Sequence, residues 1–144
     1  MLLAVLMSLI AGLFALPQAP ASQSTTAGAL DYEFFKARVQ PIFLNKKPGN
    51  ARCYVCHRGS GGTQYLQLLS PGATSWDEEQ SRKNFESVKR FVVPGAPTRS
   101  RLLMHPLTEE AGGDEFHGGG RHWTSQQNAE WQTLAAWVRG ETAK

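Results

Sequence analysis

The five residues Cys53-Tyr54-Val55-Cys56-His57 constrain this chain more than any other stretch. Two cysteines at i and i+3 lie on the same side of one helical turn, and a histidine follows directly. This Cys-x-x-Cys-His spacing is typical of covalent attachment of a c-type haem. The sequence therefore predicts thioether bonds from Cys53 and Cys56 to one porphyrin, with His57 as the proximal iron ligand.

Other uses of a Cys-x-x-Cys pair remain open at this point. A redox dithiol is expected next to a βαβ pattern, and a zinc site needs a second pair of ligands at regular spacing. The sequence shows neither. A disulfide between Cys53 and Cys56 would close a very short loop and so stabilise little. Haem attachment is the preferred interpretation, with zinc binding or redox chemistry as the alternative.

Residues 1–21 carry no charged side chain and are apolar from Leu2 to Leu16. The run is short for a bilayer span but suits the core of a secretory signal, and Ala19-Pro20-Ala21 offers a small-x-small cleavage site. We therefore expect a cleaved signal peptide and a periplasmic or extracellular protein. The alternative is an uncleaved anchor that tethers the chain to the membrane, because no Lys or Arg precedes the apolar run.

The remaining chain has the length of one domain, which we place at residues 31–144 after a flexible lead-in at 22–30. The 15 Lys and Arg against 12 Asp and Glu give a formal net charge of +3. These charges are scattered, and no basic run with interleaved aromatic residues indicates a nucleic-acid partner. No nucleophile with a base and an orienting group is evident, so the sequence does not predict an enzyme.

Helical periodicity predicts an all-α domain. An amphipathic segment begins after Asp31, where Pro41 should kink or end the regular helix. A second helix should follow Ser75 or Asp77, and a short one should follow Thr98 or Ser100. The last helix is expected from a cap at Ser125 to Gly140, with an apolar stripe of Trp131, Leu134, Ala135 and Val138.

Three segments together resemble one family. Phe35 to His57 reads F-x-x-x-V-x-P-I-F and then C-x-x-C-H, Val93 to Leu103 reads V-P-G-x-P-x-x-S-x-L-L, and Trp131 to Gly140 ends in W-V-x-G. They are similar to the short cytochrome c domains of planctomycetes and acidobacteria, a divergent branch of the class I c-type cytochromes. The resemblance covers most of residues 31–144. It implies a cytochrome c-like fold in which the first and last helices cross and pack.

The sequence offers several candidates for the second axial ligand of the iron. In the family, it comes from a loop before the last helix, usually as a methionine followed by prolines. This sequence departs from that pattern and has His117 there, among glycines that let backbone approach a flat ligand. His117 is therefore the expected distal ligand. Met104 is the first alternative, and His122 and His105 come after it.

We expect Arg121 and Trp123 to bind the haem propionates, by a charge-assisted hydrogen bond and through the indole N–H. A surface arginine and a half-buried tryptophan are equally good interpretations of these two residues. His122 could also hydrogen-bond a propionate.

The sequence thus predicts an exported monohaem c-type cytochrome that carries one electron at a time between redox partner proteins. Two imidazole ligands would give a lower reduction potential than histidine and methionine. One alternative is a haem-bearing subunit of a larger membrane electron-transfer complex, such as a respiratory complex, a reaction centre or a chain of haem proteins. Another is a haem peroxidase or gas sensor with an open distal site.

Overall fold

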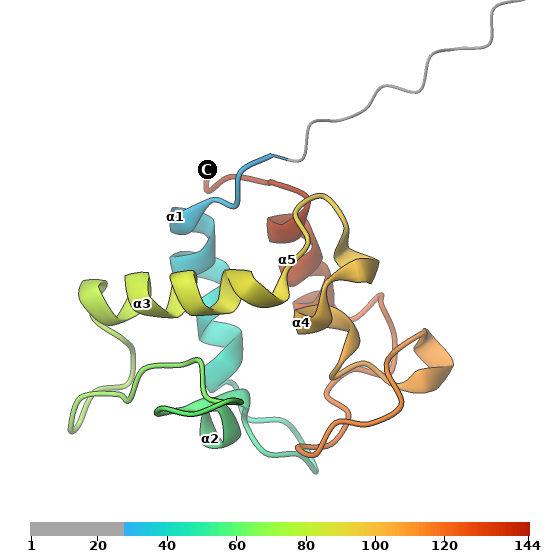
Figure 1. Cartoon of the computed structure of the whole chain (residues 1–144), viewed down its shortest axis with the longest axis horizontal. Coiled ribbons are helices and arrows are strands. Elements are labelled where there is room, and N and C mark those ends of the chain that lie inside the picture. Colours follow the sequence, from blue (N-terminus) through green and yellow to red (C-terminus); the bar gives the residue numbers. More distant parts are fainter. Residues whose placement is uncertain (1–27) are drawn as a thin grey trace, which may run out of the picture.

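The computed structural model describes residues 28–144 of the chain, and the predicted signal segment at 1–21 lies outside the described residues. The fold is built from short helical elements joined by long loops (Figure 1). In chain order these are α1 (Tyr32–Phe34), η1 (Phe35–Val39), η2 (Gln40–Leu44), α2 (Cys53–His57), α3 (Glu78–Val88), η3 (Lys89–Phe91), η4 (Pro97–Arg99), α4 (Arg101–Met104), η5 (Glu109–Ala111) and α5 (Ala129–Val138).

Within residues 28–144 the only β structure is three isolated bridges, so the all-α prediction is confirmed for this part of the chain. None of the helices found there has the length and apolar character needed to cross a membrane.

The first helical segment changes its hydrogen-bond pattern along its length. The Asp31 carboxylate caps α1 by accepting from the Phe34 amide at 2.6 Å, as predicted. Pro41 has no N–H to donate to the carbonyl of Ala37, and its ring crowds that carbonyl. The segment therefore passes through a π-helical stretch, η1, and continues as the 3-10 helix η2 to Leu44.

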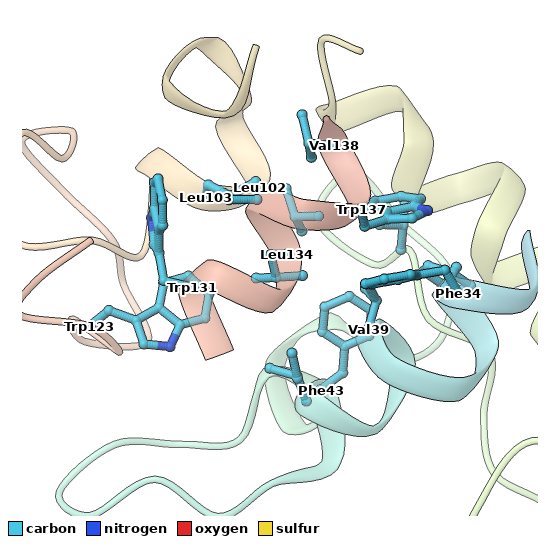
Figure 2. Close-up of a cluster of buried hydrophobic side chains, with 14 of the residues drawn as sticks. Phe34, Val39, Phe43, Leu102, Leu103, Trp123, Trp131, Leu134, Trp137 and Val138 are labelled. Atoms are coloured by element: carbon cyan, nitrogen blue, oxygen red, sulfur yellow. The ribbon is translucent and has the colours of Figure 1, made fainter. Parts of the chain in front are cut away.

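The first and last helical segments pack against each other at the centre of the core, an arrangement that the family resemblance implies (Figure 2). The rings of Phe35 and Trp137 lie 5.3 Å apart between centroids, and both are fully buried. The indole N–H of Trp137 also donates to the Asp31 carbonyl at 2.9 Å. Leu102 and Leu103 of α4 cover the opposite side of α5 (Figure 2). These contacts hold the two ends of the described chain together.

Capping explains where α3 begins, and it corrects the predicted start of α5. Asp77 forms a full capping box with Gln80, which satisfies two amides at the start of α3. Ser125 does not cap α5. Its hydroxyl accepts from the Gln127 amide in the preceding turn, and Asn128 is the cap instead.

Candidate functional site

A cavity of about 790 Å³, which includes the open space at its mouth, lies where α2 and α4 meet two of the loops. Its apolar lining comes from Phe43, Tyr65, Phe91, Leu102, Pro106 and Trp123. Cys53 and all four histidines of the chain, His57, His105, His117 and His122, also line it. The cavity thus brings together most of the predicted site residues.

On one side of the cavity, α2 presents His57 with a defined tautomer. Its Nδ1 lies 2.7 Å from the carbonyl oxygen of Thr63. A carbonyl oxygen can only accept, so Nδ1 carries the hydrogen and the Nε2 lone pair is free. The ring of Tyr65 stacks on the imidazole at 4.5 Å with a 30° tilt. A histidine that donates from one nitrogen and is free at the other is typical of metal ligands.

The two cysteines are free thiols in different surroundings. Cys53 lines the cavity, and burial raises the pKa of its thiol. Cys56 is exposed, and the residues that line the cavity do not include it. The helix α2 is in turn supported by Tyr54, whose ring meets Trp76 edge-on at 5.7 Å and whose hydroxyl accepts from the Leu69 amide.

On the other side, the glycine-rich loop presents His117. Its Nδ1 lies 2.6 Å from the carbonyl oxygen of Gly120, so by the same reasoning Nε2 is free. Burial lowers the pKa of His117, which keeps the imidazole neutral near pH 7. Its ring centroid lies 6.1 Å from that of His57, and the two planes differ by 24°. The sequence-predicted pair of histidines is therefore brought together.

The other two histidines surround His117 but differ in their hydrogen bonds. His105 packs edge-on at 5.0 Å, and its Nδ1 contacts the Asp114 carboxylate at 3.0 Å. His122 lies 5.4 Å from His117, and its buried Nδ1 has no hydrogen-bond partner. Burial lowers the pKa of His122 to about 4, so its ring is neutral at pH 7. His122 thus has a buried ring nitrogen that no protein group uses.

Met104, Arg121 and Trp123, which were also predicted at the site, make their main contacts with other parts of the protein. Met104 packs against the core and is not among the residues that line the cavity. The Arg121 guanidinium donates to the carbonyls of His105 and Leu107 and to the Glu109 carboxylate. Trp123 lines the cavity, but its indole N–H donates to the Glu130 carboxylate at 3.2 Å. A role of Arg121 and Trp123 toward propionates stays a prediction.

Three features of the site were not singled out from the sequence. Tyr65 covers the His57 ring, Asn50 reaches across to the Arg121 carbonyl, and Lys47 forms a buried ion pair with Glu130. An aromatic residue eight positions after His57 was the only sequence signal for Tyr65. Asn50 and Lys47 carried no such signal, because a polar loop ordinarily faces solvent.

Within residues 28–144, no three His, Cys, Asp or Glu side chains are grouped as ligands of a bare metal ion. Comparison of the chain with known protein families, with curated proteins and with solved structures found no match.

Proposed function

We propose that this chain is a monohaem c-type cytochrome with a cytochrome c-like fold. Cys53 and Cys56 would hold the porphyrin by thioether bonds, and His57 and His117 would be the axial ligands of the iron. When bound, the haem supplies reversible one-electron chemistry. The protein would carry electrons between redox partners outside the cytoplasmic membrane, and a membrane complex is one such partner.

The spacing of His57 and His117 is the observation that carries this proposal. The two ring centroids lie 6.1 Å apart and their planes differ by 24°, so the two histidines are near enough to each other that both would bind one metal. Each ring gives its Nδ1 hydrogen to a backbone carbonyl, which leaves both Nε2 atoms available to a metal. The Cys53 thiol lines the same cavity as the two rings.

The other cavity residues also fit a porphyrin. Its faces are apolar, and Phe43, Leu102 and Trp123 offer it apolar surface. Its two carboxylates need donors, and His122 has a buried Nδ1 without a partner. Arg101 also lines the cavity and brings a positive charge to it.

The chain's own residues would keep the iron coordination fixed during electron transfer. The carbonyls of Thr63 and Gly120 hold the two imidazole tautomers, and Tyr65 restricts rotation of the His57 ring. Two neutral nitrogen ligands held in this way limit the reorganisation that accompanies a change in charge. An open distal site, as in a peroxidase or gas sensor, would leave His117 without a metal bond.

Mass analysis and a visible spectrum of protein made together with a c-type maturation system test this proposal. We expect the mass of one haem added to the chain and a low-spin spectrum that carbon monoxide barely changes. His117→Ala should become high-spin and bind carbon monoxide. His105→Ala is the matched control, because it removes a neighbouring cavity histidine, and it should stay low-spin.

If the protein purified from this system lacks the mass of a covalently attached haem, the proposal is refuted. A haem-bearing wild type that is high-spin would favour the open-site alternative. A His117→Ala variant that stays low-spin, together with a Met104→Ala variant that turns high-spin, would show that Met104 is the distal ligand.

A further inference from the structure

Two loops that are distant in the sequence meet at the cavity. The loop between η2 and α2 leads to Cys53, and the loop before α5 carries His117 (Figure 1). The Asn50 side chain joins them, because its Nδ2 donates to the backbone carbonyl of Arg121 at 2.9 Å. Asn50 thus connects the loop that leads to Cys53 with the backbone of the His117 loop.

The neighbouring residue, Gly120, leaves room for the Asn50 side chain because it has no Cβ. Its φ of +84° is a backbone conformation that favours glycine, and a Cβ there would overlap the Asn50 amide oxygen. Gly120 also makes two hydrogen bonds with His117. Its carbonyl accepts from the imidazole Nδ1 at 2.6 Å, and its amide donates to the His117 carbonyl at 3.0 Å.

The far side of this loop segment is also fixed. The Arg121 guanidinium donates to the carbonyls of His105 and Leu107, and the His122 amide donates to the Pro106 carbonyl at 2.8 Å. Residues 120–122 are therefore held from one side by the chain around Pro106 and from the other by Asn50. The Asn50 bond connects this segment to the loop that leads to α2.

We propose that Asn50 is a positioning residue for the distal ligand. By holding the carbonyl of Arg121, it keeps Gly120, and through Gly120 the imidazole of His117, opposite His57. This inference rests on the proposed function, because positioning matters when His117 binds the iron. Asn50 touches no reacting atom and acts through the loop backbone alone.

The rate at which carbon monoxide binds to the ferrous haem measures this role. In a six-coordinate haem, carbon monoxide binds when the distal ligand is off, so the rate reports how often His117 leaves. Asn50→Asp keeps the shape but loses the N–H donors, and Asn50→Ala loses both. One hydrogen bond of ordinary strength predicts a rate about five-fold higher in each variant. Gly120→Ala should act in the same direction, because its Cβ displaces Asn50.

Asn45→Ala is the matched control. Asn45 lies at the start of the same loop and donates its amide to the Glu130 carboxylate at 2.9 Å, and not to the backbone of the His117 loop. The variant loses a comparable hydrogen bond and should keep the wild-type carbon monoxide rate. A second readout is the ring ¹⁵N spectrum of His117, where Asn50→Asp should weaken the Nδ1–H signal while the ring of His57 is unaffected.

Wild-type rates and an unchanged His117 ring signal in both Asn50 variants would overturn the inference. An equal rise in the Asn45→Ala rate would also overturn it, because general destabilisation would then explain the effect. If the wild type carries no haem, the proposed function fails instead, and the ring spectrum of the haem-free chain still decides whether Asn50 fixes the His117 tautomer.

Discussion

Replacing Glu130 by Gln should destabilise the fold strongly, because it leaves a buried charge unpaired. The Lys47 side chain is 8% exposed and forms an ion pair with the Glu130 carboxylate. That carboxylate also accepts from Asn45 at 2.9 Å and from the Trp123 indole at 3.2 Å. Gln keeps the shape of Glu130 but removes its charge, so the Lys47 ammonium would stay buried without a counter-ion.

The size of this effect follows from the burial of the two partners. Removing one partner of a buried ion pair costs about 3–5 kcal/mol. The Glu130 side chain is 27% exposed, so water offsets part of the loss, and about 2–4 kcal/mol is expected. For a domain of this size the melting temperature should fall by about 10 °C. Lys47→Met combined with Glu130→Gln should recover most of the loss, because the charge is then gone.

The pH dependence of Glu130→Gln gives a second test with a definite sign. Burial lowers the pKa of Lys47, and the variant lacks the neighbouring carboxylate that would favour the charged ammonium. Between the folded pKa and the unfolded value of about 10.4, the unfolded chain binds more protons, so stability rises with pH. The deficit of the variant relative to wild type should therefore be smaller at pH 9.5 than at pH 7 in urea titrations.

Glu79→Gln is the control for this experiment. Glu79 pairs with Lys83 on the exposed face of α3, and its loss should leave the melting temperature essentially unchanged. The reasoning is refuted if Glu130→Gln is as stable as wild type at pH 7, or if the double variant is no better than the single one.

Three further changes test the scaffold. Asp77→Ala removes the capping box of α3 and should cost about 1 kcal/mol of unfolding free energy, whereas Ser75→Ala should be neutral. Leu134→Ala opens a cavity at the fully buried centre of α5 and should cost about 2–5 kcal/mol, seen as a lower urea midpoint with an unchanged slope. Gly140→Ala forces a side chain into a φ of +92° beside Gly28 and should cost about 1–2 kcal/mol by thermal melting.

The helices could be predicted from the sequence where a local signal fixes them. Asp31, Asp77 and Gly140 act at the element that carries them, and the structure has them in the predicted roles. The predicted start of α5 was wrong because the sequence has two possible cap residues, Ser125 and Asn128, three positions apart. Ser125 bonds within its own turn, and Asn128 takes the cap, a choice that depends on where the preceding loop arrives.

The hydrogen bonds around the candidate site could not be predicted from the sequence. Four histidines could be named as site residues, but which ring nitrogen is free depends on carbonyls such as those of Thr63 and Gly120. The hydrogen-bond partners of Arg121 could not be predicted from the sequence either. A loop without regular structure leaves its carbonyls unpaired, and in this fold Arg121 satisfies two of them.

The division between a helical core and a loop-built cavity has a consequence for folding. The contact between η1 and α5 buries apolar surface whether or not the cavity is filled, so it is the part most resistant to local opening. The loops at 45–52 and 112–123 are joined to each other by the Asn50 bond, and the second of them carries the cavity residues His117, His122 and Trp123. A group bound between His57 and His117 stabilises both loops together by its binding free energy. Hydrogen exchange in these two loops should therefore slow when the cavity is filled, while exchange in α5 changes little.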